Sequence, residues 1–353
     1  MRTVTVRDTR LHWVATLSLL FMGVGFLAPA RADDEKPSAP RFQLEWGKKG
    51  TAEGEFHFPI GIAINRKDEV FVSDFYNNRV QKFSAEGKFL AAFEVADNPA
   101  GLSVDAEDNL YIAHFGLTPN KKRNDERGRK KDQVSVHDAG GKLLRAWGKT
   151  GAGDGEFEMP GQVVVSKGGK VYVSDQVNRR IQVFDPRGKF LFKWGKQGAK
   201  PGEFGASSTH RLQFFAGPTF LALDSKGNLY ATEARECRVQ KFAPEGKPLL
   251  LWGGDAEKPG QFGGLFGGLG VRVAGFHGPM GICVDNKDRV WVCSIAGRVQ
   301  QFSEKGAYLQ GFGAAGTKPG QFYAPHGMAI DSRGALFVVD SFNHRIQKFA
   351  AAK

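Results

Sequence analysis

The chain has 353 residues and a formal net charge of +12, and 41% of its residues are apolar, which is enough for a packed core. Its three cysteines are too few for a disulfide framework. Two domains would fit this length, but one sequence phrase recurs six times along the chain, and this repetition favours a single closed body.

The N-terminal segment has the pattern of a secretory signal peptide. Three arginines precede an apolar run from Leu11 to Leu27, and a small-x-small cleavage site ends at Ala32. We therefore expect residues 1–32 to be a signal peptide cleaved near Ala32, and the protein to be exported to the periplasm or the extracellular space. Residues 33–41 are then a flexible leader, and no membrane span remains. The apolar run is marginal for a span, which needs about 20 residues, so an uncleaved anchor is the alternative.

Each repeat contains four short runs with the character of β-strands. In the third copy, residues 161–165 are almost wholly apolar, as expected of a strand that is covered on both faces. Residues 171–175 and 180–184 alternate between apolar and polar side chains. Turns rich in Gly, Asp and Asn separate the runs, and a fourth run ends in Trp or Phe. Each copy therefore predicts one four-stranded blade.

The number of strands predicts how the ring closes. Only five of these fourth runs follow the six copies, and they end at Phe93, Trp147, Trp194, Trp252 and Phe312. The segment Phe42–Gly47 resembles a fourth run without inner strands of its own, and the last copy is one strand short. We therefore predict an all-β fold, a six-bladed β-propeller over residues 42–349 in which the N-terminal strand completes the last blade. Residues 350–353 are a C-terminal tail.

The repeats resemble the NHL repeat family. The family's core pattern stands in three copies as Asp74-Phe-Tyr-Asn-Asn-Arg79, Asp175-Gln-Val-Asn-Arg-Arg180 and Asp340-Ser-Phe-Asn-His-Arg345. The resemblance covers roughly residues 42–349 and implies a six-bladed β-propeller.

The charged residues of this pattern recur in most copies. A catalytic group is needed once, whereas buried charges that recur with the fold persist when they are paired. We therefore expect a structural role, locking blades together, for Asp74, Arg79, Asp175, Arg180, Arg238, Arg298, Asp340 and Arg345. Three copies depart from the pattern, with His114, Gln133, Glu233 and Ser294 in the acidic or basic positions.

Three insertions fall on one predicted face of the ring. The loop before each inner strand and the loop between the second and third strands open on the same face. The insertions lie in such loops, at Leu117–Asp132, Gly205–Gly217 and Gly263–Gly278. Loops elaborated on a rigid scaffold commonly carry binding sites. We therefore predict contact residues on this elaborated face at Tyr76, His114, Gln176, Arg235, His326 and Phe342.

The first insertion is strongly basic. Its cationic residues are Lys121, Lys122, Arg123, Arg127, Arg129, Lys130 and Lys131. Such a cluster can bind nucleic acid, anionic glycans or phospholipid headgroups, and a solvated surface loop is the alternative.

Histidines concentrate on the same face, which raises the hypothesis of a metal site. Neutral imidazole is the commonest metal ligand. His114 and His326 are the candidate ligands because they end strands near the channel, and zinc or another divalent ion is the cofactor they would hold. A hydrogen-bonded loop histidine is the alternative for each.

Three functions remain open. The sequence contains no Gly-x-Ser-x-Gly, His-Glu-x-x-His or paired-cysteine motif, which favours a binding or scaffold module for a protein, peptide or glycan. The alternative is a metal-dependent lyase, because residues 72–79 are similar to peptidylglycine-amidating lyase. That resemblance implies a catalytic role for Tyr76, and Pro325-His326 matches the family's zinc-histidine pattern at one of the equivalent positions. Nucleic-acid binding is the third function, and export argues against it.

Two of the cysteines lie on consecutive predicted strands. In the register expected for this hairpin, Cys283 faces Trp291 and lies only diagonally from Cys293. Diagonal neighbours are usually too far apart for an unstrained disulfide, so we expect no bond between them.

Overall fold

The computed structural model of the protein describes residues 39–116, 132–206, 215–263 and 278–351. The chain divides into two units at residues 35 and 36, and every described residue belongs to the second. The predicted signal peptide, most of the leader and the basic residues from Lys121 to Lys131 lie outside the described residues.

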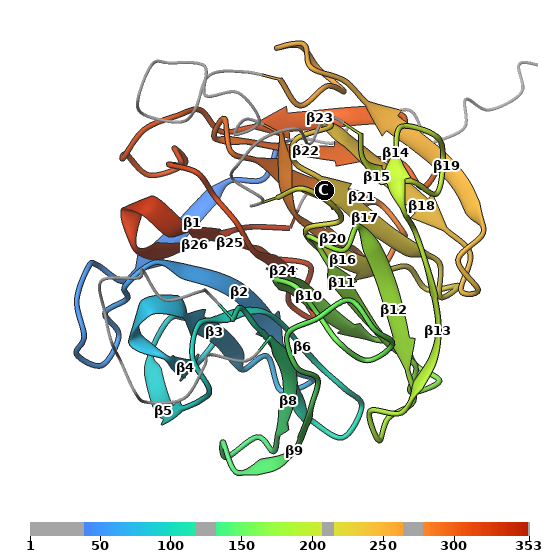
Figure 1. The fold of residues 1–353 in the computed structure, drawn as a ribbon. Coiled ribbons are helices and arrows are strands. Elements are labelled where there is room, and N and C mark those ends of the chain that lie inside the picture. The colour runs from blue at the N-terminus through green and yellow to red at the C-terminus, as the bar shows by residue number, and fades with distance from the viewer. Residues whose placement is uncertain (1–38, 117–131, 207–214, 264–277, 352–353) are drawn as a thin grey trace, which may run out of the picture. The chain divides into compact units, whose positions relative to one another are not determined.

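Six four-stranded antiparallel sheets are the blades of a β-propeller (Figure 1). Blade one contains β2 (Pro59–Ile64), β3 (Val70–Asp74), β4 (Arg79–Phe83) and β5 (Phe89–Glu94). Blade two contains β6 (Pro99–Val104), β7 (Leu110–His114), β8 (Gln133–His137) and β9 (Leu143–Trp147). Blade three contains β10 (Pro160–Val165), β11 (Val171–Asp175), β12 (Arg180–Phe184) and β13 (Phe190–Trp194).

The second half of the ring repeats this order. Blade four contains β16 (Leu221–Leu223), β17 (Leu229–Glu233), β18 (Arg238–Phe242) and β19 (Pro248–Gly253). Blade five contains β20 (Pro279–Val284), β21 (Val290–Ser294), β22 (Arg298–Phe302) and β23 (Tyr308–Phe312). Blade six contains β24 (Met328–Ile330), β25 (Leu336–Asp340), β26 (Arg345–Phe349) and β1 (Phe42–Trp46). The short elements are β14 (Gln197–Gly198), β15 (Phe204–Gly205) and the 3-10 turns η1 (Phe75–Asn77) and η2 (Ser341–Asn343).

The N-terminal strand closes the ring, as predicted. β1 pairs antiparallel with β26, and Trp46 lies opposite Ile346 in this pairing. The inner strands contact one another in the order β2, β6, β10, β16, β20 and β24, and β24 contacts β2 again. The all-β, six-bladed propeller predicted from the repeats is therefore confirmed.

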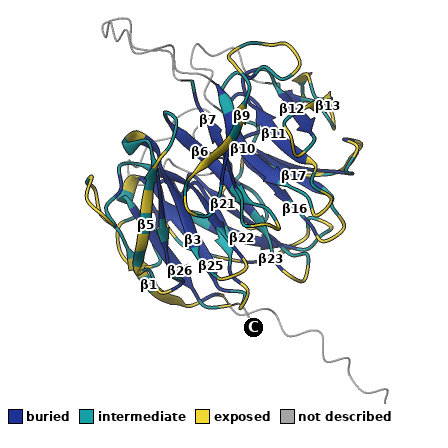
Figure 2. Ribbon diagram, turned by 90° about the horizontal axis from the view of Figure 1, so that it is seen from below, coloured by how far each residue is buried: buried dark blue, intermediate teal, exposed yellow. Residues whose placement is uncertain are grey.

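Burial within a blade decreases from the inner strand outward. Five of the six residues of β10 are buried, because this strand is covered on both faces. β13 alternates between intermediate and exposed residues, since one of its faces meets solvent. Figure 2 shows the same gradient, with buried strands inside and exposed segments at the outer edges of the blades.

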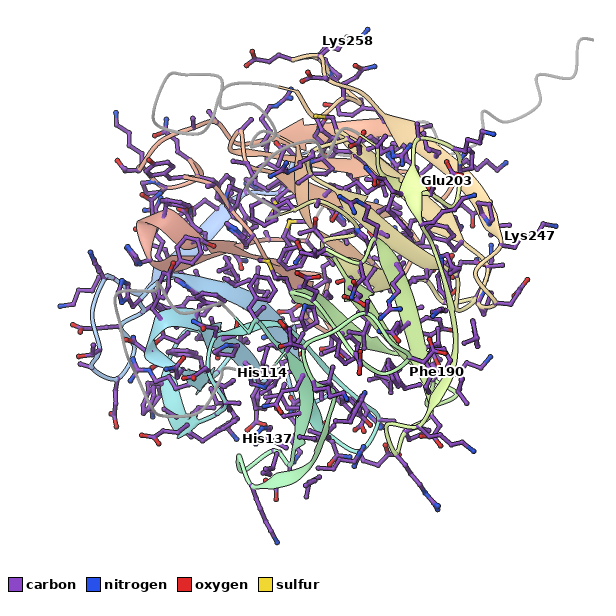
Figure 3. The ribbon with its side chains drawn as sticks, in the orientation of Figure 1. His114, His137, Phe190, Glu203, Lys247 and Lys258 are labelled. Atoms are coloured by element: carbon purple, nitrogen blue, oxygen red, sulfur yellow. The ribbon has the colours of Figure 1, made fainter. Side chains whose placement is uncertain are left out.

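Aromatic rings at the ends of the outer strands join neighbouring blades. Each ring packs on the third strand of the next blade, as in Trp147 on Phe184, with ring centroids 5.7 Å apart. Further pairs of this type are Trp46–Phe83, Trp194–Phe242, Trp252–Phe302 and Phe312–Phe349. In blade two, His137 takes the place of the aromatic partner and packs against Phe93 at 5.9 Å (Figure 3). The six outer ends read from the sequence are therefore contacts between blades.

Side-chain hydroxyls join the same blades near the axis. Each of them lies on a second strand and donates to a carbonyl of the next blade: Ser73 to Ala100, Ser174 to Thr219 and Thr232 to Met280, over 2.6, 3.0 and 2.8 Å. In blade five the thiol of Cys293 donates to the carbonyl of His326 at 3.2 Å instead. Neighbouring blades are thus joined by hydrogen bonds near the axis and by aromatic contacts at the rim.

None of the three cysteines, all of which lie in the described ranges, forms a disulfide. Cys283 lies opposite Trp291, which confirms the predicted register of this hairpin. In the described part of the chain, no helix is long and apolar enough to cross a membrane.

Deleting Phe42–Gly47 should leave β26 as an open sheet edge and remove the packing of Trp46 on Phe83 and Phe337. We expect the variant to aggregate and to lose about 3 kcal/mol or more of unfolding free energy. Size-exclusion chromatography and chemical unfolding measure both effects, and a chain starting at Arg41 is the matched control. A soluble monomer of unchanged stability would contradict this account of ring closure.

Candidate functional site

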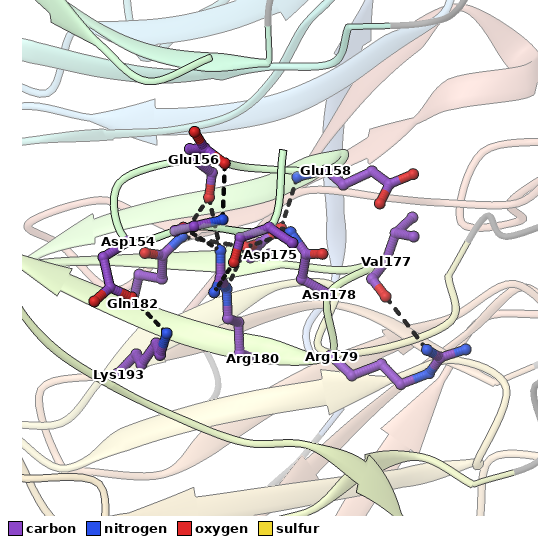
Figure 4. Close-up of polar contacts among 12 residues, drawn as sticks. Asp154, Glu156, Glu158, Asp175, Val177, Asn178, Arg179, Arg180, Gln182 and Lys193 are labelled. Atoms are coloured by element: carbon purple, nitrogen blue, oxygen red, sulfur yellow. Dashed lines mark hydrogen bonds and ion pairs between the residues drawn. The ribbon is translucent and has the colours of Figure 1, made fainter. Parts of the chain in front are cut away.

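The acidic residue that ends the second strand holds the loop between two blades. In blade three, the Asp175 carboxylate accepts a hydrogen bond from Arg180 at 2.7 Å and another from the backbone N–H of Glu158 at 2.8 Å. Arg180 also donates to the carbonyls of Ala152, Gly153 and Glu156, over 2.7 to 2.9 Å. These carbonyls belong to the loop from β9 of blade two to β10 of blade three (Figure 4). One ion pair thereby ties two blades together.

The same pairing recurs around the ring. Carboxylate and guanidinium groups are 2.6 to 2.8 Å apart in the pairs Asp74–Arg79, Glu233–Arg238 and Asp340–Arg345. In blade five Ser294 replaces the acid, and within the described residues Arg298 donates to loop carbonyls, those of Gln261 at 3.3 Å and Gly263 at 2.5 Å. The residues predicted to be structural therefore hold the loops that enter the inner strands, which belong to the elaborated face.

Blade two holds the equivalent loop with different residues. His114 is fully buried, and its ring nitrogens contact the carbonyl of Ala96 at 3.1 Å and the hydroxyl of Ser135 at 2.7 Å. Asp132 of blade two also supplies a buried carboxylate, which accepts from the backbone N–H groups of Gly116 at 2.7 Å and Met159 at 3.0 Å. Met159 lies in the loop into blade three, which Asp175 also holds. Sequence analysis missed this contact because Asp132 is not at the position of the motif acid.

A cavity of about 230 Å³ opens where the second strands end and the inner strands begin. Aromatic side chains from four blades dominate its wall: Phe58, Phe75 and Tyr76 of blade one, Phe115 of blade two, Phe215 and Phe220 of blade four, and Phe342 of blade six. The other lining residues are Ile60, Gly161, Gln176, Thr219, Ile295, Ala324 and His326. None of these described lining residues carries an acidic, lysine or arginine side chain.

Four of the six predicted contact residues meet at this cavity: Tyr76, Gln176, His326 and Phe342. His114 lies in the hydrogen-bonded interior of blade two, and Arg235 is not among the lining residues. The phenylalanines were missed, although Phe75 and Phe115 occupy the same repeat position as Gln176, directly after the motif position at the end of the second strand. That shared position is the signal that could have found them.

Phe58 sits at the centre of the aromatic cluster in a left-handed backbone conformation, with φ of 64°. This backbone conformation is unfavourable for a bulky residue. It persists where the surrounding structure fixes the direction of the side chain, as is typical of functional sites. Its backbone N–H donates to Nδ1 of His344 at 3.0 Å. Its ring packs edge-on against Phe342 at 5.0 Å and His326 at 5.4 Å. The backbone therefore holds this ring in the cavity wall.

The rim of the cavity is exposed, whereas its interior is buried. Tyr76 and Phe342 are 52% and 39% exposed, although apolar rings of this size usually seek burial. His326, deeper in the wall, is 5% exposed, and its Nδ1 lies 2.9 Å from the carbonyl of Ala324. Nδ1–H must donate in this contact, which leaves Nε2 as a hydrogen-bond acceptor. Burial lowers the pKa of His326 to about 4, so the ring is neutral at neutral pH.

The described residues do not assemble a metal site. No group of three or more His, Cys, Asp or Glu side chains within the described ranges could hold an ion. Both ring nitrogens of His114 have partners inside blade two, and His326 has only Nε2 to offer. The donor set on the described ranges therefore does not fit zinc.

The two buried histidines should make stability depend on pH. Burial lowers the pKa of both His114 and His326 to about 4 in the folded state, from an ordinary value of 6.5. The unfolded chain then binds more protons, so stability falls as pH drops from about 6.5 towards 4. We expect each histidine to cost about 2 kcal/mol between about pH 7 and pH 5. Urea unfolding should show a smaller loss for His326→Gln, and equal losses in both proteins would refute the burial argument.

The matches to known proteins agree with the repeat pattern. The family model described as NHL repeat matches residues 56–83 and 322–349, which lie in blades one and six. Over 52 residues the chain is 36% identical to "Protein brain tumor" of Drosophila melanogaster, and over 48 residues it is 42% identical to "Protein lin-41" of Caenorhabditis elegans. These matches cover 15% and 14% of this chain, and it spans only 5% and 4% of those relatives.

Solved structures share the fold at low sequence identity. A protein of unknown function from Bacteroides thetaiotaomicron is 17% identical with a TM-score of 0.63, covering 88% of this chain and 76% of that one. Virginiamycin B lyase from Staphylococcus aureus is 13% identical with a TM-score of 0.53, covering 88% and 99%. A gluconolactonase from Xanthomonas campestris is 14% identical with a TM-score of 0.56, covering 90% and 96%. At these identities the likeness establishes the fold alone, that of a β-propeller, and the family model identifies NHL repeats at residues 56–83 and 322–349 of its six blades.

Proposed function

We propose that this protein is an exported binding module that captures a peptide or protein segment by seating an apolar side chain in the aromatic cavity of its elaborated face. The observation that carries the proposal is the wall itself, which combines seven aromatic side chains from four blades with no charged side chain among the described lining residues. Pockets of this composition take apolar groups and use a few polar atoms to orient them.

The energetics favour a large apolar side chain as the captured group. Burying one such side chain contributes about 1.5–3 kcal/mol, and edge-to-face aromatic contacts add about 0.5–1.5 kcal/mol. Tyr76 and Phe342 at the rim are exposed enough to make these contacts with an incoming ring. Exposed aromatic residues around a pocket are the usual energetic centre of a protein interface.

A peptide fits the cavity better than a glycan does. Sugars bring many hydroxyl groups, and each one that is buried needs a hydrogen-bond partner. The side chains of the described wall that can form hydrogen bonds are those of Tyr76, Gln176, Thr219 and His326. A peptide residue needs fewer partners because its side chain can be wholly apolar.

The basic segment of the sequence favours a protein partner with acidic character. The chain passes from β7 to β8 through the segment with the seven basic residues between Lys121 and Lys131. β7 ends at the same side of its blade as the cavity-lining Phe115. Charge in this segment would speed the approach of an acidic partner, while the cavity supplies the short-range contacts. Export follows from the signal-peptide pattern, and N-terminal sequencing of the native protein should begin at Asp33.

Truncating the exposed rim should abolish capture and spare the fold. We expect Tyr76→Ala and Phe342→Ala to weaken binding of an aromatic-containing peptide, selected from a displayed library, by about tenfold or more each. Isothermal titration calorimetry measures the affinity, and thermal unfolding should change by no more than about 2 °C.

Tyr308→Ala is the matched control for this experiment. Tyr308 is 39% exposed, like Phe342, but begins the outer strand of blade five, far from the cavity lining. If Tyr308→Ala or the opposite-face variant Lys226→Ala weakened peptide binding as much as the rim variants, the cavity would not be the binding site.

A metal-dependent lyase is the second candidate, because Tyr76 and His326 line the same cavity. The resemblance of residues 72–79 to peptidylglycine-amidating lyase implies a catalytic role for Tyr76, and Pro325-His326 matches one of that family's zinc-histidine positions. The donor set described above does not fit zinc, and we derive no reaction from it. Nucleic-acid binding would require that the protein is not exported.

Metal analysis separates the two candidates. We expect the purified protein to retain well below one equivalent of zinc after dialysis, because His326 offers a single ring nitrogen and His114 offers none. Elemental mass spectrometry measures the content. About one equivalent that is lost on His326→Ala, with Tyr308→Ala as the control, would favour the lyase over the binding module.

A further inference from the structure

The polar side chain of Gln176 lies in the cavity wall without a hydrogen-bond partner among the described residues. Gln176 follows directly after Asp175 at the end of β11 and is 1% exposed. Both its Nε2 and its Oε1 are buried without a hydrogen bond from the described residues. A buried carboxamide in this state destabilises the fold, so its presence calls for a compensating role.

The corresponding positions of the other blades show that the fold does not need a carboxamide here. The residue after the motif position is Phe75 in blade one, Phe115 in blade two, Ala234 in blade four, Ile295 in blade five and Ser341 in blade six. Four of these five side chains are apolar and bury no polar group. Gln176 therefore buries an unpaired polar group at a position where four of the other five blades have an apolar side chain.

Packing holds the carboxamide of Gln176 in the cavity wall. A Cβ atom placed on Gly161 would lie 2.5 Å from Nε2 of Gln176, so the amide rests directly on the backbone of β10. Gly161 and Thr219 line the cavity on either side of this contact. The amide is consequently presented in a fixed position, as a binding group must be.

His326, another polar side chain of the wall, lies across the ring from Gln176. Gln176 belongs to blade three and His326 to blade six, and these blades are opposite in a ring of six. His326 is neutral and accepts at Nε2, whereas Gln176 offers one donor group and one acceptor side by side. Both groups are uncharged, so they would recognise a neutral ligand.

We propose that Gln176 is a specificity-determining residue that pairs with an amide of the ligand, so that the cavity takes an apolar residue together with its flanking peptide amide. The N–H and C=O of one extended peptide residue, which belong to the two amides that flank its side chain, point to the same side, and a primary carboxamide presents the same donor and acceptor pair. Pairing either with Gln176 satisfies both buried atoms at once. Water competes poorly for this position, because the surrounding wall is apolar and offers few further partners. The volume of about 230 Å³ suits one residue rather than a longer segment.

This inference rests on the proposed capture of an apolar group, and two small probes separate the two ideas. Phenylpropanamide carries a ring and a carboxamide, and phenylbutanone replaces the amide nitrogen with a methyl group. We expect the wild-type protein to bind the amide roughly tenfold more tightly than the ketone in calorimetric titrations. Gln176→Met, which keeps the length of the side chain, should abolish the preference.

A stability measurement shows that the variant is folded. Gln176→Met removes the unpaired carboxamide, and its melting temperature should rise by about 2–4 °C. Ser341→Ala is the matched control, because Ser341 occupies the same repeat position, its hydroxyl is also buried without a partner, and it does not line the cavity. This control should keep the preference for the amide.

The outcomes distinguish the two proposals. Equal binding of both probes to the wild-type protein would overturn the role of Gln176 and leave apolar capture intact. A preference that survives in Gln176→Met would also overturn it. If neither probe binds, both the amide specificity and the capture function are wrong.

Discussion

A carboxylate that is buried at the end of a strand is stable only when its charge is matched, and this requirement organises the propeller. In blade three the match is Arg180, whose remaining donors bind the loop that arrives from blade two. Because the pair fixes the end of β11, it also fixes the residue that follows, Gln176, in the wall of the cavity. The same interaction in blade one presents Phe75 and Tyr76. The interaction that closes the fold therefore also builds the site.

The departures from the motif aspartate coincide with the elaborated loops. Blades two, four and five, which carry the insertions, have His114, Glu233 and Ser294 where blades one, three and six have Asp, and of these three only Glu233 keeps the ion pair, with Arg238. In blade two His114 contacts the carbonyl of Ala96 in the loop into that blade. Asp132, at the end of the insertion, accepts from the backbone N–H groups of Gly116 and of Met159 in the loop into blade three. Loops are therefore still held where the motif acid is absent, and one face can vary while the ring stays closed.

Much of this architecture could be predicted from the sequence, because it is carried by residues that recur. The repeated phrase predicted the six blades, and the isolated N-terminal strand at Phe42 predicted how the ring closes. The alternation of side chains along the strands predicted that Cys283 lies opposite Trp291. Only some of the residues that line the cavity were predicted. Tyr76 and Phe342 followed from chain direction, but Phe58 reaches the wall through a left-handed backbone and a hydrogen bond to His344, 286 residues away. Contacts between blades of this kind leave no local pattern. His114 was placed at the site by its position alone, and its partner Ser135 draws it into the blade interior.

A six-bladed ring leaves space at its axis, and what fills the end of that space decides what the protein can bind. Here aromatic side chains of four blades narrow this space to a small apolar cavity. The polar side chains Gln176 and His326 in its wall are uncharged and lie on opposite blades. Such a wall selects through desolvation, because any charged group that entered would lose its water without gaining a counter-charge. The hydrogen bonds and aromatic contacts between blades keep the cavity wall rigid. Binding therefore loses little conformational entropy of the protein. The stability of the ring thus tolerates a buried, unpaired amide, and the ligand that supplies its partner is favoured over one that merely fills the space.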